Sequence, residues 1–125
     1  MRHHLIAGIA FLFSTSALAA DIPTDLQVEL QSAMLSYIDE IVVDGAYTYV
    51  DTKEQAVKTA YPANIHPIIV PFGDDYFVCS EMVDDSGNKM TADFLVRLIE
   101  GDYRVVQLII DDRKAMEVAM SKLGQ

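Results

Sequence analysis

Cysteine is nearly absent from this sequence, which has 125 residues and a single cysteine, Cys79. A lone cysteine cannot form a disulfide within the chain, and a chain of this length can bury enough of a core not to need one. The thiol is then a buried small hydrophobe, a reactive group or a link to a second chain, and burial is the default for such a residue.

Long apolar runs are scarce as well. The run Leu5–Phe13 has nine residues, whereas a helix that crosses a bilayer needs about 20. Arg2 precedes this run and the small-x-small sequence Ala-Leu-Ala follows it, which is the pattern of a secretory signal peptide. The sequence therefore predicts a cleaved leader at residues 1–20 and a periplasmic or secreted single domain at residues 21–125, with no membrane anchor.

Basic residues are few, with 9 Lys and Arg against 19 Asp and Glu. The predicted leader holds one basic residue and no acidic one, so the formal net charge changes from −10 for the whole chain to −11 for residues 21–125. Nucleic-acid binding is excluded, because it needs Lys and Arg to neutralise phosphates. Anionic membranes are disfavoured, which leaves cations, basic peptides and uncharged ligands as partners.

Residues 24–42 are expected to form one amphipathic helix. Thr24 and Gln27 have the spacing of a capping box at its start, and Gly45 is the expected stop. Apolar residues recur every three or four positions and form one stripe: Leu26, Leu30, Ala33, Met34, Tyr37, Ile38 and Ile41.

The segment 46–61 has two interpretations. The capping-box spacing of Thr52 and Gln55 could start a helix, which Pro62 would end. Strand-forming residues on both sides of that spacing instead predict a hairpin that turns through residues 52–55. We adopt the hairpin, because it accounts for both halves of the segment.

The rest of the chain has the pattern of an antiparallel meander followed by a helix. Strands are expected at residues 68–72, 76–83, 90–99 and 103–110, and Asp111-Asp112 offers the cap of a closing helix. The fold class is therefore α+β, with an N-terminal amphipathic helix packed on a bent antiparallel sheet of about five strands and a short C-terminal helix. The last strand is apolar on both faces, and a short helix covers the second face thinly. That face is a candidate homodimer interface or ligand pocket.

The element order resembles a known fold class. A helix, a hairpin and a three-stranded meander, with the helix across a bent sheet, resemble the cystatin-like or nuclear-transport-factor-like roll. The segments YPANIHP and DFLVRLIEGDYRVVQLIIDDR resemble uncharacterised small secreted bacterial proteins, which implies compartment but no activity. Members of the roll class act as enzymes, ligand binders or inhibitors, so the resemblance selects no function. Cystatin-type inhibition would need that family's Gln-x-Val-x-Gly hairpin, which this sequence lacks.

Few residues in the sequence could bind a metal ion or act with a reactive thiol. After loss of the leader His66 would be the only histidine, so neither a metal site nor a cofactor is predicted. A catalytic pair of His66 and Cys79 depends on the turn between their strands. An even turn, such as Gly73-Asp74, puts His66 opposite Glu81 and diagonal to Cys79, whereas an odd turn puts the pair on opposite faces. Pro67 makes the first strand an edge or irregular strand.

Aromatic residues suggest a binding surface. The expected ligand-binding residues are Tyr37, Tyr47, Tyr49, Phe94 and Tyr103, because aromatic rings with polar handles commonly line pockets. The predicted function is a non-catalytic accessory domain that binds a small apolar ligand or a protein partner, with no catalytic residue assigned. The alternative is a small acid–base enzyme of the roll class, with Asp93 or Asp39 as the base beside these tyrosines.

The homodimer can be tested by analytical ultracentrifugation of the purified protein. We expect self-association at high protein concentration, because pairing of the second sheet face would remove apolar surface from water. A strict monomer at high concentration would contradict this expectation.

Overall fold

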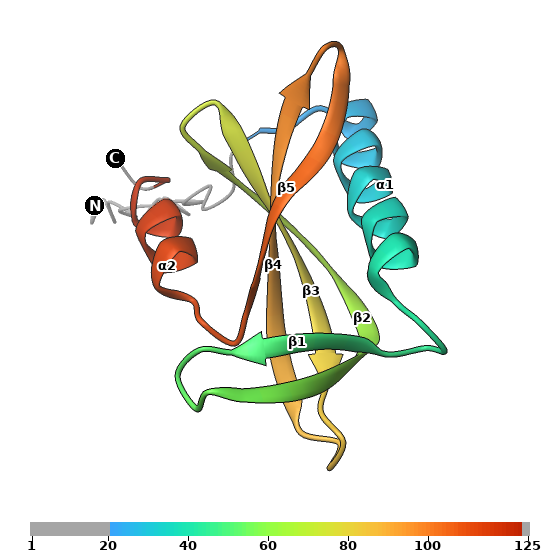
Figure 1. The fold of residues 1–125 in the computed structure, drawn as a ribbon. Helices are drawn as coiled ribbons and strands as arrows, with labels where there is room; N and C mark the ends of the chain where they lie inside the picture. The colour runs from blue at the N-terminus through green and yellow to red at the C-terminus, as the bar shows by residue number, and fades with distance from the viewer. Residues whose placement is uncertain (1–20, 124–125) are drawn as a thin grey trace, which may run out of the picture.

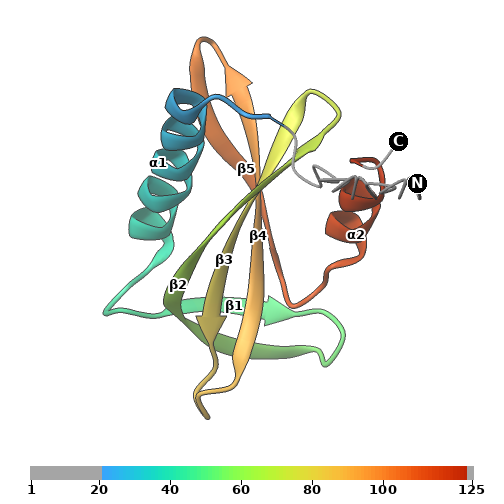
Figure 2. The same cartoon turned by 180° about the vertical axis from the view of Figure 1, so that it is seen from behind.

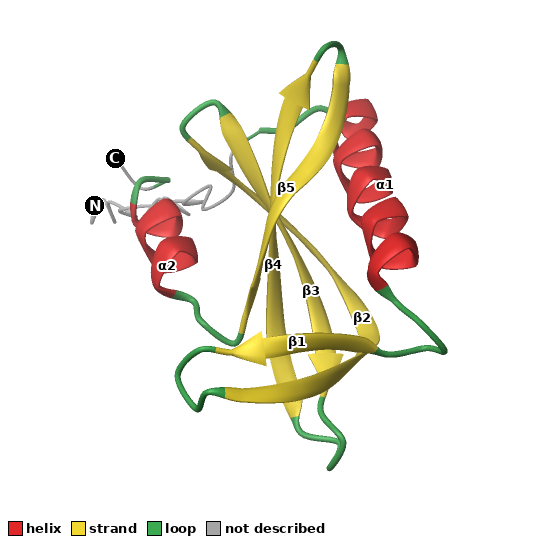
Figure 3. Ribbon diagram, in the orientation of Figure 1, coloured by secondary structure: helices red, strands yellow, loops and turns green. Residues whose placement is uncertain are grey.

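The chain folds as a helix, an antiparallel meander and a second helix (Figure 1, Figure 3). The computed structural model describes residues 21–123, so the predicted leader lies outside the described residues. The elements are α1 (Thr24–Ile41), β1 (Tyr47–Asp51), β2 (Ala56–Phe72), β3 (Asp75–Val83), β4 (Lys89–Ile99), β5 (Asp102–Ile110) and α2 (Lys114–Ser121). The five strands pair in chain order. The α+β prediction is confirmed, and neither described helix is long and apolar enough to cross a membrane.

Strand β2 changes its partner part-way along its length. Residues 56–60 pair with β1, whereas residues 61–72 pair with β3. The register shifts between Pro62 and Asn64 and again between Ile65 and Ile69. Two separately predicted strands are therefore one bent strand, whose proline-containing half is an edge because it pairs on one side only. A proline there removes no second ladder bond.

The bend in β2 turns β1 and the start of β2 into a hairpin arm, residues 47–60, that crosses the lower part of the sheet in Figure 1. Asp51 pairs with Ala56, which confirms the predicted hairpin with its turn at residues 52–55. Tyr47 and Tyr49 of the arm pack against the same hydrophobic cluster as α1. The arm and α1 thus cover the same face of the sheet.

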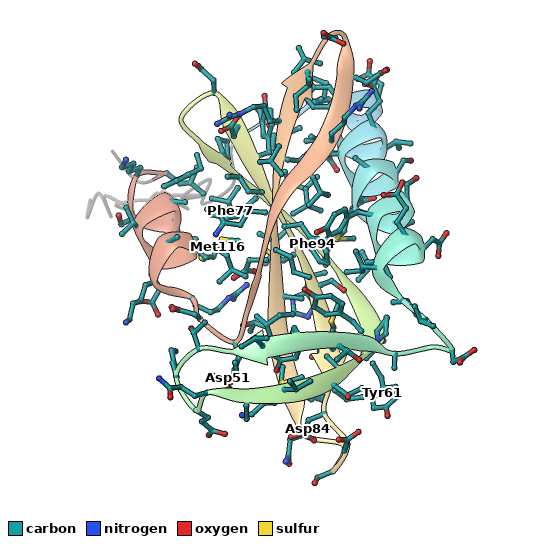
Figure 4. All side chains as sticks on the ribbon, in the orientation of Figure 1. Asp51, Tyr61, Phe77, Asp84, Phe94 and Met116 are labelled. Atoms are coloured by element: carbon teal, nitrogen blue, oxygen red, sulfur yellow. The ribbon has the colours of Figure 1, made fainter. Side chains whose placement is uncertain are left out.

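Two hydrophobic clusters lie on opposite faces of the sheet, as the two helices do (Figure 2). On one face Leu30 and Met34 of α1 belong to the cluster that contains the fully buried Phe94 of β4. On the other face Met116 of α2 belongs to the cluster that contains Phe77 of β3 (Figure 4). The face that the sequence left thinly covered is thus occupied in part by α2, and the homodimer stays a prediction.

The ends of α1 differ from their expected form. Pro23 occupies the N-cap and no side chain caps the helix, because Thr24 is already helical and the Gln27 side chain donates to the Ile22 carbonyl at 2.7 Å. The helix ends at Ile41, and Gly45 lies in a later tight turn with Asp44. The capping box and the glycine stop were therefore wrong, although the helix itself was predicted within one residue.

The core on the α1 face can be tested by Phe94→Ala. We expect this change to lower the free energy of unfolding by about 3–5 kcal/mol, because it leaves a cavity at a fully buried site. Val57→Ala in β2, where the side chain is 72% exposed, should change it by less than about 0.5 kcal/mol. Urea denaturation of the two variants measures both values, and equal effects would contradict this account of the core.

Candidate functional site

A surface groove runs between α1 and the first half of β5. Its α1 wall presents Val28, Ser32, Ser36 and Glu40 in successive turns, and its other wall is residues 101–105. The groove has a volume of about 610 Å³. Ser32 and Ser36 are short and exposed, so their side chains leave the groove open where α1 packs beside β5.

A second hollow of about 590 Å³ lies between the hairpin arm and the end of β5. Ion pairs hold its rim: Lys58 Nζ lies 2.8 Å from Asp51 and 2.6 Å from Glu54, and Lys53 Nζ lies 3.8 Å from Asp112. The hydrogen bond from Lys58 is the main reason that the pKa of Asp51 is lowered to about 2. Acidic and basic groups of this hollow therefore largely satisfy one another.

The five predicted binding residues all lie on the α1 face of the sheet, but they do not form one pocket. Tyr37 and Tyr103 line the α1–β5 groove, whereas Tyr47 and Tyr49 line the second hollow. Phe94 is fully buried and lines neither of them; it meets Tyr37 edge-to-face at a centroid distance of 6.1 Å. The space between helix and sheet is thus filled by side chains, and the hollows lie at its margins.

The two tyrosines of the arm remain neutral hydrogen-bonding groups. Their rings stack at 5.6 Å. Burial raises the pKa of Tyr47, and nearby Tyr37 adds to the increase. Burial is also the largest cause of the raised pKa of Tyr49, whose hydroxyl lies 3.7 Å from the Met90 sulfur and donates to it. Tyr37, which raises the pKa of Tyr47, lines the groove, whereas Tyr47 lines the second hollow.

A buried polar cluster lies on the opposite face, under α2. Asp93 in β4 is 1% exposed and accepts hydrogen bonds from Arg113 Nη2 at 2.9 Å and Nε at 3.2 Å. Arg113 Nη2 also lies 3.6 Å from Cys79 Sγ. Arg113 is not among the residues predicted from the sequence. The sign that a cation must reach this position is Asp93 itself, an acidic residue in the middle of an apolar strand.

The two residues of the hypothetical thiol pair have different partners. The turn between β2 and β3 is the even turn Gly73-Asp74, yet the register shift in β2 puts Asn64, and not His66, opposite Glu81. His66 Nε2 still lies 3.7 Å from Glu81, whereas Cys79 contacts Arg113. Within residues 21–123 no hydrogen bond joins His66 to the thiol, so the geometry gives the histidine no role as its base.

Burial makes the thiol inert. Burial raises the pKa of Cys79 to about 12, with Asp93 adding to the increase and Arg113 opposing it. A thiol that stays protonated at physiological pH is a poor nucleophile and a poor metal ligand. In the described part of the chain no three potential ligands from His, Cys, Asp and Glu lie together as a metal site would require.

Comparisons with protein-family models, with curated proteins and with solved structures gave no match to this chain. The resemblance to the cystatin-like roll therefore stays a prediction, and function has to be argued from the geometry of the groove and its surroundings.

The raised pKa of Cys79 predicts a loss of stability in alkali. Above about pH 9 the thiol ionises in the unfolded chain, whereas its raised pKa keeps it protonated in the folded chain up to about pH 12. The unfolded state then binds fewer protons, so the free energy of unfolding should fall by about 1 kcal/mol per pH unit across this window.

Cys79→Ala should remove this part of the pH dependence, which urea denaturation of both proteins between pH 8 and pH 11 would measure. Identical pH profiles would show that the thiol ionises equally in both states. The native thiol should also resist labelling until the chain unfolds.

Proposed function

We propose that the chain is a non-catalytic accessory protein of the periplasm or extracellular space that binds a protein partner in the α1–β5 groove. The observation that carries this proposal is the position of the groove: it lies along β5, the terminal strand of the sheet, whose outer side pairs with no described segment. A strand edge beside a helix offers both backbone hydrogen bonds and side-chain contacts to a partner.

The alternative, an acid–base enzyme, receives little support from the carboxylates. Such an enzyme needs an acid with a perturbed pKa close to the tyrosines. Asp93 is the only buried carboxylate among residues 21–123, and it faces α2, paired with Arg113. Asp39 is exposed on α1 and does not line the groove. Neither candidate base therefore lies in a tyrosine-lined hollow.

A protein partner also fits better than a small apolar ligand. Sites for small ligands enclose most of the ligand surface. Leu30, Met34 and Phe94 are fully buried between α1 and the sheet, and the groove lies at the margin of this packed core. An open groove suits an elongated occupant.

Photo-crosslinking in the producing cells tests this function. Benzoylphenylalanine at Val28, which is 56% exposed in the groove, should give adducts of one discrete mass, to be identified by mass spectrometry. The matched control is Val118 of α2, a helical valine that is 50% exposed on the opposite face. Equal adducts from both positions, or none from Val28, would contradict the proposal. Adducts of the chain with itself alone would indicate the homodimer instead.

A further inference from the structure

The turn between β4 and β5 fixes which backbone groups of β5 point outward. Glu100 and Gly101 have φ of 50° and 87°, which is the form of a two-residue type I′ turn. In such a hairpin the flanking residues Ile99 and Asp102 form two backbone hydrogen bonds with each other. Farther from the turn, pairs without hydrogen bonds alternate with hydrogen-bonded pairs. The N–H and C=O groups of Tyr103 and Val105 consequently face away from β4.

These outward groups open into the groove. Both Tyr103 and Val105 line it, opposite the short side chains of Ser32, Ala33 and Ser36 on α1. No other described segment makes a backbone hydrogen bond to this side of β5. The strand edge is thus unpaired at residues that line the groove.

The charge of the groove is one-sided. Its acidic residues are Glu29, Glu40 and Asp102, and its only basic residue is Arg104. Helix α1 contains no lysine or arginine along its whole length. The salt bridges within residues 21–123 involve none of these three carboxylates. In contrast to the paired rim of the second hollow, the groove therefore keeps unneutralised acidic groups.

We infer that the groove binds an extended segment of a partner protein in which basic and apolar residues alternate, and that this segment adds to β5 as a sixth strand. This inference rests on the proposed function. Alternate side chains of an added strand would point toward α1. A lysine or arginine there can lay its apolar stem along Val28 and Tyr103 while its charge reaches Glu29 or Glu40. A second copy of this chain is disfavoured, because two such grooves would bring like charges together.

Synthetic peptides test strand addition directly. The probe is a fluorescent peptide with the nine-residue length of β5, alternating lysine and valine, titrated with the purified protein by fluorescence anisotropy. We expect saturable binding that weakens as salt rises, and none for the peptide with glutamate in place of lysine. In two further peptides every second backbone amide is N-methylated, at the odd positions in one peptide and at the even positions in the other. Since only one edge of an added strand pairs with β5, one of these should bind and the other should not.

Charge variants of α1 separate local recognition from the overall charge. The variant E29K/E40K changes both helix carboxylates of the groove, whereas D25K/D39K makes the same change in net charge at helix positions outside it. We expect about a tenfold loss of affinity for the lysine peptide in the first variant, and less than about threefold in the second. Unchanged far-UV circular dichroism would confirm that both fold.

The outcomes distinguish this inference from the function on which it rests. Equal losses in the two variants, equal binding of both methylated peptides, or binding of the glutamate peptide would each overturn strand addition by a basic segment. If Val28 gives crosslinks to a partner but the lysine peptide does not bind, the proposed function survives and this inference fails. If Val28 gives no crosslinks and the lysine peptide does not bind, the proposed function and this inference both fail. If ultracentrifugation shows a dimer, and if E29K/E40K makes that dimer more stable, the occupant of the groove is a second copy of this chain and not a partner protein.

Discussion

The change of partner along β2 is the constraint on which the rest of the structure depends. Because the strand leaves β1 near Tyr61 and joins β3, the first hairpin becomes an arm that folds over the sheet instead of extending it. The arm and α1 then share one face, and α2 takes the other. The three prolines of β2 lie in the half that pairs on one side only, where a missing N–H costs no ladder bond. Because of this one irregular strand, a short chain has a hydrophobic cluster on each face of its sheet.

The two faces use charge in opposite ways. Under α2 the buried Asp93 is matched by Arg113, as a carboxylate removed from water requires. On the α1 side the carboxylates near β5 are exposed and unmatched, which is affordable because water solvates them. The first arrangement joins the start of α2 to the centre of the sheet, beside the buried thiol of Cys79. The second leaves an acidic surface beside free backbone groups.

Local patterns in the sequence were sufficient for most of the fold but not for the arrangement of the site. The apolar stripe of α1 and the alternation along β4 and β5 follow from helix and strand periodicity, so their bounds were predicted closely. The structure puts the five aromatic residues on the α1 face of the sheet. Their division between two hollows depends on the bend after Pro62, which no periodic signal contains. The pairing of Asp93 with Arg113, and the loss of regular register around His66, likewise arise from contacts between segments that are distant in the chain.

The type I′ turn at Glu100-Gly101 has a consequence for how such a surface could change over evolution. Its two residues lie outside α1, yet their number sets the phase of hydrogen bonding along β5 as far as the register shift between Leu95 and Val96. A shift of one residue in the pairing would exchange the inward and outward backbone groups between the turn and the register shift at Leu95/Val96, and would move the side chains there to the other face. Side chains on α1 can thus be replaced one at a time to adjust the specificity of the groove. The length of the turn is more constrained, because it determines which residues of β5 near the turn present their backbone groups at the edge.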